Sequence, residues 1–74
     1  MVTTDGDTSG DGGLDPELVA MVEEVARGRS VAEIAAQQRL SPRTVRRRLA
    51  HLRDAWGCRN NIVLAVEAVR RHII

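Results

Sequence analysis

The sequence predicts an all-α domain, and three observations support that prediction. Its 74 residues include one Trp and no Phe or Tyr, so the core must be built from aliphatic side chains, which suit packed helices better than a sheet. Apolar residues recur at spacings of three and four along four separate segments. Capping residues and glycines divide those segments, so we expect four helices joined by very short links.

The first 13 residues, MVTTDGDTSGDGG, are predicted to form a disordered tail. They show no hydrophobic periodicity and consist mostly of Gly, Asp, Thr and Ser, which cannot offset the entropy of ordering. Asp5, Asp7 and Ser9 match the first three ligand positions of an EF-hand calcium loop. The twelfth position is Pro16 instead of Glu, however, and no helix precedes the loop, so we expect no calcium site.

The folded domain is predicted to span residues 14–74. Its first helix begins at Pro16, is capped by Asp15 and ends at Gly28, because Pro suits the first helical position and Gly the position after the last. The other helices are expected over residues 30–38, over residues 42–56, and from Asn60 or Asn61 toward the C-terminus.

Basic residues are concentrated in the second half of the chain. Residues 1–38 hold two Arg against eight Asp or Glu, whereas residues 39–74 hold nine Arg against two acids, although the formal net charge is only +1. Arg43, Arg46 and Arg47 lie at helical spacing on one face of the third predicted helix. The opposite face holds the apolar residues Val45, Leu49, Leu52 and Trp56. A face that served only solubility would mix acids with these mutually repelling arginines, so this face is a candidate binding surface.

The second and third predicted helices, joined by a turn at residues 39–41, have the arrangement of a helix-turn-helix. In such motifs the second helix enters the DNA major groove and its N-terminal residues contact the bases. We therefore expect double-stranded DNA as the partner, with Arg46 and Arg47 at guanine edges. Arg43 is a further candidate base contact, with the DNA backbone as the alternative. Short hydroxyls, guanidinium groups and free N–H groups at a helix start can hold a phosphate. The candidate phosphate contacts are Ser41, Thr44, Arg39 and Arg48.

The stretch SVAEIAAQQRLSPRTVRRRLAHLRDAWGCRN resembles the DNA-binding domain of LuxR-type bacterial transcription regulators, also called GerE- or FixJ-type. That family has a run of the form S-x-x-E-I-A-x-x-L-x-[IL]-S-x-x-T-V-[KR]-x-x-L, followed by an L-G-x-x-[NS] element and an Ala-rich fourth helix. The resemblance covers residues 14–74. It implies a four-helix fold in which the third helix recognises DNA and the fourth forms a dimer. It also implies phosphate contacts for Thr44 and the Val45 backbone, and base contacts for Arg46 and Arg47.

A few positions differ from that family pattern. Gln38 and Arg39 stand where the family has Leu-Gly, which places a polar residue in the core and an arginine where the turn favours the left-handed conformation of Gly. Leu18 replaces a polar Glu in the first helix. Ala50 matches a further contact position but is too short to reach the bases. We expect these differences to affect the turn and the docking more than the fold.

The fourth predicted helix has more apolar residues than one buried face requires. Its surplus is predicted to form a homodimer surface, which would place two half-sites about 10 bp apart on DNA. The residues of that surface are Val63, Val66, Val69 and Ile73. The alternative is that these residues only close the core of the monomer.

Two other functions fit the same residues. Region four of bacterial sigma factors has a similar helix pair, and Arg46 and Arg48 match its pattern, which would make RNA polymerase a partner. Gly57, Arg59 and Asn60, together with the full fourth helix, favour the LuxR-type interpretation instead. A helix-turn-helix that has lost DNA binding could also use its arginine face on an acidic protein, and the acidic N-terminal half keeps that alternative open.

Several functions are not expected. No apolar run approaches the roughly 20 residues of a membrane span, and acids near the N-terminus do not suit a signal peptide, so we expect a cytoplasmic protein. Cys58 has no second cysteine and is expected to be a small buried hydrophobe. His51 and His72 lie on different predicted helices without a paired carboxylate, so we expect no enzyme activity, metal site or cofactor.

Overall fold

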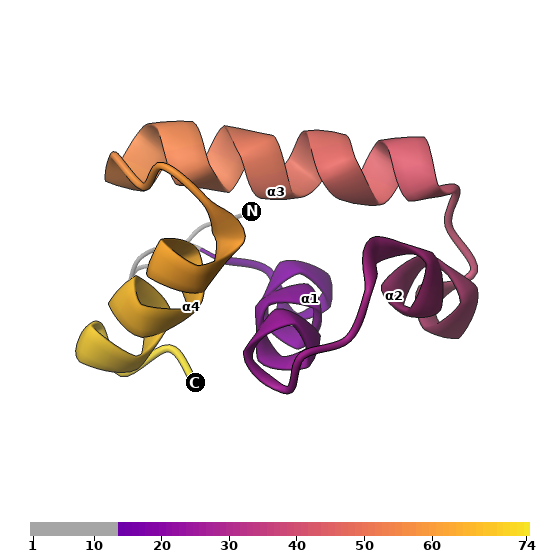
Figure 1. The fold of residues 1–74 in the computed structure, drawn as a ribbon. Coiled ribbons are helices and arrows are strands. Elements are labelled where there is room, and N and C mark those ends of the chain that lie inside the picture. Colours follow the sequence, from indigo (N-terminus) through magenta and orange to yellow (C-terminus); the bar gives the residue numbers. More distant parts are fainter. Residues whose placement is uncertain (1–13) are drawn as a thin grey trace, which may run out of the picture.

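The computed structural model describes residues 14–74 of the chain and folds them into four helices (Figure 1). The helices are α1 (Pro16–Ala26), α2 (Val31–Gln38), α3 (Pro42–Trp56) and α4 (Asn61–Arg70). No strand occurs within this described range. The predicted all-α fold with four helices is therefore confirmed. The tail and the EF-hand-like stretch lie outside the described residues.

Each helix begins at a side chain that caps its first N–H groups. The cap oxygen accepts the backbone N–H of the residue three positions on, at 2.8–3.1 Å, and so satisfies a donor that the helix itself leaves unpaired. The four caps are Asp15, Ser30, Ser41 and Asn60. Of the two possible starts of α4, the structure therefore selects Asn61, with Asn60 as the cap.

Each helix also ends in the same way, at a residue with a positive φ angle. The residue after it donates its N–H to the carbonyl five positions back at 2.8–3.0 Å, which is the Schellman arrangement. The positive-φ residues are Gly28 (85°), Arg39 (57°), Gly57 (68°) and His72 (60°). Gly adopts this conformation freely, whereas a residue with a Cβ atom loses roughly 1 kcal/mol. Arg39 and His72 therefore hold strained backbone at the ends of α2 and α4.

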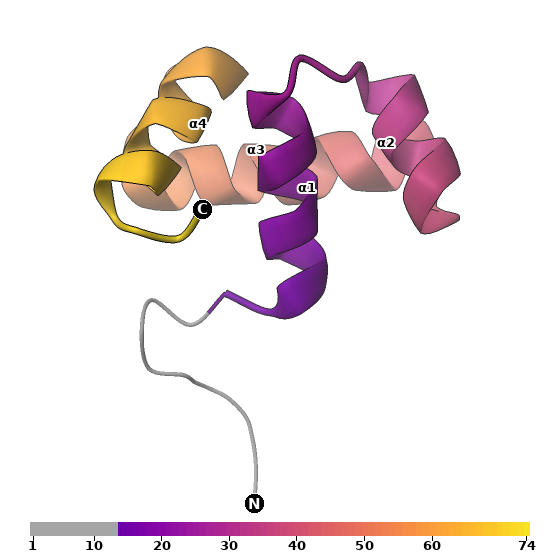
Figure 2. The same ribbon diagram turned by 90° about the horizontal axis from the view of Figure 1, so that it is seen from below.

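The longest helix, α3, lies across the other three, which all sit on one side of it (Figures 1 and 2). The central helix α1 contacts α2, α3 and α4, whereas α2 and α4 pack near opposite ends of α3. The buried core is entirely apolar and consists of Met21, Val22, Ile34, Ala35, Val45, Leu49, Leu52, Leu64 and Ala68. Because all its partners lie on one side, the outer face of α3 is not covered by any helix of the described range.

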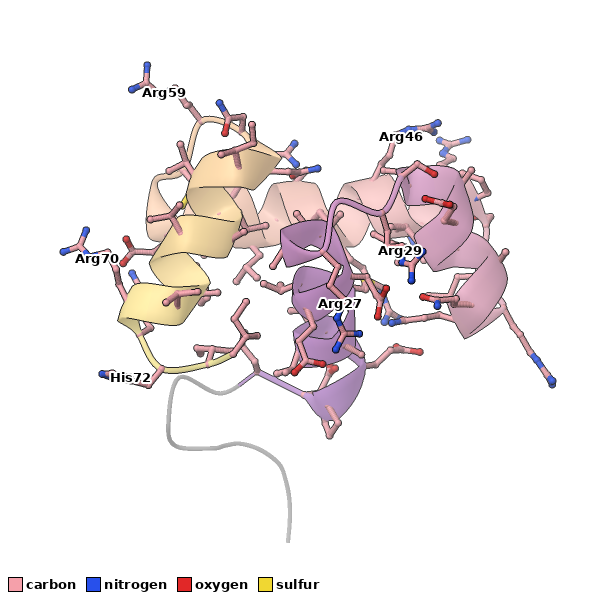
Figure 3. The ribbon with its side chains drawn as sticks, turned by 60° about the horizontal axis from the view of Figure 1, so that its bottom comes forward. Arg27, Arg29, Arg46, Arg59, Arg70 and His72 are labelled. Carbon is pink, nitrogen blue, oxygen red and sulfur yellow. The ribbon has the colours of Figure 1, made fainter. Side chains whose placement is uncertain are left out.

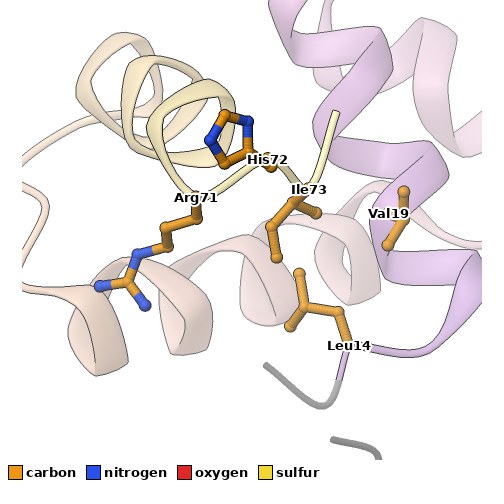
Figure 4. A pocket seen from close by; sticks show the side chains of 5 residues that line it. All are labelled: Leu14, Val19, Arg71, His72 and Ile73. Carbon is orange, nitrogen blue, oxygen red and sulfur yellow. The ribbon is translucent and has the colours of Figure 1, made fainter. Parts of the chain in front are cut away.

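The C-terminal residues fold back onto the domain. The Arg71 guanidinium lies 4.3 Å from the ring centre of Trp56, close enough for a cation–π contact. Ile73 packs against the core and lines a small pocket with Leu14 and Val19 (Figure 4). The Arg71 side chain points away from Leu14 and Val19, so no cationic group is directed between them. Arg71 and His72 complete the lining, so the pocket under the C-terminus is bordered by both apolar and polar side chains.

Candidate nucleic-acid interface

The turn between α2 and α3 is fixed by backbone hydrogen bonds on both sides. Arg39 adopts the left-handed conformation that the sequence predicts for its position, and Leu40 then donates its N–H to the Ala35 carbonyl at 2.9 Å. Leu40 is half-buried against the core, which anchors the turn. Ser41 directly follows as the cap of α3. The three-residue turn therefore sets the angle at which α3 leaves α2.

The two faces of α3 differ completely in chemistry. Val45, Leu49 and Leu52 are at most 5% exposed and fix the helix to the core. The side chains of Arg43, Arg46 and Arg47 are exposed on the uncovered side, and Figure 3 shows Arg46 pointing away from the bundle. No carboxylate within residues 14–74 forms an ion pair with any of these three arginines. Three unpaired guanidinium groups are therefore presented together by one rigid helix.

The start of α3 brings two hydroxyls together. The Ser41 Oγ accepts the Thr44 N–H at 3.1 Å and lies 2.9 Å from the Thr44 Oγ1. The family resemblance implies a phosphate contact for the Val45 backbone, but the Val45 side chain is fully buried and its N–H already donates to the Ser41 carbonyl at 3.1 Å. The Arg43 N–H has no acceptor among the described residues. The free backbone donor at this helix start is therefore that of Arg43 and not that of Val45.

Arg48 has a partner that the sequence did not predict. Its Nη1 donates to the Oε1 of Glu17 in the first turn of α1, 31 positions earlier in the chain. The two side chains remain 40% and 45% exposed, so the pair lies at the surface. No local pattern could have indicated it, because the contact depends on how α1 crosses α3. Arg48 is thus placed beside the predicted phosphate-binding residues while held by a carboxylate.

Gln38 and Arg39, the two unusual turn residues, have opposite environments. Gln38 is half-buried beside the apolar core, and its Oε1 is buried and accepts no hydrogen bond from the described residues. The Arg39 side chain is exposed and makes no hydrogen bond or ion pair within the described part of the chain. The turn therefore presents a free cation next to the start of α3.

The predicted dimer residues divide into two groups. Val66 and Val69 on α4 are each 55% exposed, and Ile62 beside them is 76% exposed. Together with Val25, Ala26 and Ala65 they line a shallow cleft of about 340 Å³. Val63 is half-buried, and Ile73 packs against the domain's own core. The contribution of α1 to this apolar surface depends on the fold and was not apparent from the α4 sequence alone.

The remaining candidate groups are separated from one another. His51 is exposed on α3, and His72 lies at the end of α4. Among residues 14–74 no three His, Cys, Asp or Glu side chains are grouped as metal ligands. Cys58 is half-buried and packs against the core. Arg59 and Arg70, at opposite ends of α4, point outward (Figure 3). No helix in the described range is both long enough and apolar enough to cross a bilayer.

Comparison with known proteins identifies the central part of this architecture. A family model described as a helix-turn-helix domain matches residues 19–60, which is more than half of the 74 residues and extends from α1 to the cap of α4. No curated protein and no solved structure matches the chain. The matched region includes the turn and the arginine-bearing face of α3. The chain therefore belongs to the helix-turn-helix domain family, a class of DNA-binding domains.

Proposed function

We propose that this protein is a sequence-specific transcription regulator of the LuxR type that inserts α3 into the major groove of double-stranded DNA. The observation that supports this most directly is the set of three arginines on the uncovered face of α3, immediately after the turn, which form no ion pair within residues 14–74. Guanidinium groups donate two parallel hydrogen bonds to guanine O6 and N7. Arg46 and Arg47 are assigned to the bases, and Arg43 is a further base contact at the start of the helix.

The phosphate contacts are assigned to groups that flank the base-contacting residues. Thr44 and Ser41 offer hydroxyls at the helix start, and the Arg43 N–H lies beside them. Arg39 offers a free guanidinium from the turn, and Arg48 lies one helical turn beyond Thr44. Contacts to phosphate fix the register of the protein on DNA without reading sequence.

The surface formed by Ile62, Val66 and Val69 is assigned to a homodimer contact. A second copy would cover these exposed apolar side chains and place two α3 helices on a two-fold related site, with half-sites about 10 bp apart. Val63 is half-buried, so it offers less area to such a contact, and Ile73 packs against the monomer core. Size-exclusion chromatography with light scattering tests this assignment, and the mass of a monomer at all concentrations with and without DNA would contradict it.

Two alternatives fit part of the same evidence. A sigma-factor-like module would use α3 on promoter DNA while tethered to RNA polymerase, but the full α4 that follows favours the LuxR-type assignment. A protein-interaction module would use the arginine face on an acidic protein. The first alternative predicts binding to one half-site without two-fold symmetry, and the second predicts no binding to any duplex.

Selection of bound duplexes from a random pool tests the proposal and its alternatives together. A LuxR-type dimer should enrich a two-fold related sequence, and about four phosphate contacts per subunit give a log–log salt slope near −3.6 per subunit. Arg46→Ala and Arg47→Ala should each cost about 1–3 kcal/mol and relax base preference, whereas Arg48→Ala should weaken all duplexes alike. Binding that is absent or insensitive to salt would refute the proposal.

A further inference from the structure

We infer that Glu17 competes with a DNA phosphate for Arg48 and thereby limits the affinity of the domain for any duplex. This inference rests on the proposed function, because it concerns the same face of α3. It assigns a role to a residue of α1, an element with no expected DNA contact. The observation behind it is the ion pair between Glu17 and Arg48 that joins α1 to α3.

This ion pair differs from the other four that occur within residues 14–74. Each of those four ion pairs joins residues at most five positions apart, at or just beyond the end of one helix. Glu17 and Arg48 are instead 31 positions apart and lie on two different helices. Both side chains are roughly half-exposed, so the pair is hydrated and contributes little to the stability of the fold. Its partners can therefore exchange without unfolding the domain.

Arg48 lies where a phosphate is expected. It is four positions after Thr44 on α3, so the two side chains are neighbours on the same flank of the helix. A phosphate at the Thr44 hydroxyl would be within reach of the Arg48 guanidinium, which prefers bidentate contacts with phosphate or carboxylate oxygens. Glu17 supplies such a carboxylate in the free protein. DNA must displace it or accept a second negative charge beside its own phosphate.

The other arginines on the outer face of α3 are not restrained in this way. Arg43, Arg46 and Arg47 have no carboxylate partner in the described part of the chain. Glu17 therefore acts on the one arginine of α3 that is assigned to phosphate and leaves the predicted base contacts unchanged. Its effect should consequently be the same for every DNA sequence, because phosphates are common to all of them.

The test compares Glu17→Gln with a matched charge control. Glu23→Gln removes the same charge from the same helix at an exposed residue that forms no ion pair within the described range. Binding is measured at 50–100 mM salt to a selected duplex and to a duplex of mixed sequence. Glu17→Gln should tighten binding to both by about three- to tenfold, the gain expected from freeing one phosphate contact. Glu23→Gln should change it by less than about twofold.

A double-mutant cycle shows whether the effect passes through Arg48. In an Arg48→Gln background, Glu17→Gln should no longer tighten binding. Any of three results would overturn the inference. Glu17→Gln and Glu23→Gln could change the affinity equally, Glu17→Gln could still tighten binding in the Arg48→Gln background, or Glu17→Gln could weaken binding. Thermal unfolding of each variant confirms that it is folded. If the wild type binds no duplex, the proposed function fails as well, whereas salt-dependent binding without the Glu17 effect overturns this inference alone.

Discussion

Replacing Arg39 with Gly should change stability and DNA binding in opposite directions. Arg39 holds a φ of 57° at the end of α2, a conformation that Gly adopts without a steric penalty. Its side chain is exposed and contributes no hydrogen bond or ion pair within residues 14–74. The fold would therefore be more stable with Gly at this position, because nothing within the described residues offsets the cost of the arginine.

The size of each effect follows from the geometry. Relief of the left-handed backbone gains roughly 1 kcal/mol, part of which is lost because Gly has more freedom in the unfolded chain. The unfolded-state loss is about 0.4–1 kcal/mol, so the net gain is at most about 0.6 kcal/mol and should raise Tm by up to roughly 5 °C in a domain of this size. Loss of one phosphate contact lowers the magnitude of the log–log salt slope by about 0.9 and weakens binding about eightfold at 0.1 M salt.

The assay combines thermal unfolding, followed by circular dichroism, with a salt titration of duplex binding by fluorescence anisotropy. His72→Gly is the matched control for strain, because His72 has a φ of 60° but lies at the end of α4, away from Arg46 (Figure 3). It should raise Tm by a similar amount without affecting DNA affinity. Arg39→Lys keeps both the charge and the strained backbone, so it should alter neither quantity appreciably.

Two results would refute this reasoning about Arg39. An unchanged salt slope in Arg39→Gly would show that the side chain does not contact phosphate. A lower Tm would show that the left-handed backbone is not the dominant energetic term at this position. An increase in Tm accompanied by weaker, less salt-dependent binding would mean that the domain keeps a strained residue for the sake of DNA binding.

Three further predictions concern stability. Gln38→Leu should raise the free energy of unfolding by about 1 kcal/mol in a urea titration, because the Gln38 Oε1 is buried without a hydrogen-bond donor. Gly57→Ala should lower the free energy of unfolding by about 1 kcal/mol, and Tm by a few degrees, because the φ of 68° disfavours any side chain. Steric overlap does not contribute, since a Cβ at this position would meet no atom within 4 Å. Hydrogen bonds from the Ser30 backbone N–H and side chain lower the pKa of Glu33 below its ordinary value. A carboxyl with a lowered pKa stabilises the fold above its unfolded-state pKa, and this stabilisation is lost as the pH falls through the folded-state pKa. The free energy of unfolding of Glu33→Gln should therefore depend less on pH between 6 and 3 than that of the wild type.

Most of the fold could be predicted because local signals specify it. Each helix starts at a side chain that accepts the backbone N–H of the residue three positions later. Residue types that can cap a helix in this way are visible in the sequence. The third helix was predicted with its exact bounds because Ser41 and Pro42 begin it and Gly57 ends it. The end of the second helix was harder, because Arg39 takes the conformation that Gly usually provides. The lapse of the apolar pattern near Gln38 predicted where the helix ends, whereas the left-handed conformation of Arg39 was implied only by the family resemblance.

The candidate site could be predicted only in part. Helical periodicity placed Arg43, Arg46 and Arg47 on the face opposite the core, and their exposure follows from that placement. The pairing of Arg48 with Glu17 could not be predicted, because it depends on the crossing of two helices that are distant in sequence. A pattern of spacings describes one helix at a time, so it gives the direction of a side chain but not its neighbours on other helices.

The arrangement of charge in space explains how a chain of net charge +1 can present a strongly basic surface. At physiological ionic strength the Debye length is about 8 Å, whereas the domain extends 34 × 26 × 18 Å along its principal axes. Acids on the far side of the domain are therefore screened from a phosphate at the outer face of α3. An acid at the near edge, such as Glu17, is not screened, since it lies against Arg48 itself. The affinity for DNA should thus depend on the few charges within one Debye length of α3, and much less on the total charge of the protein.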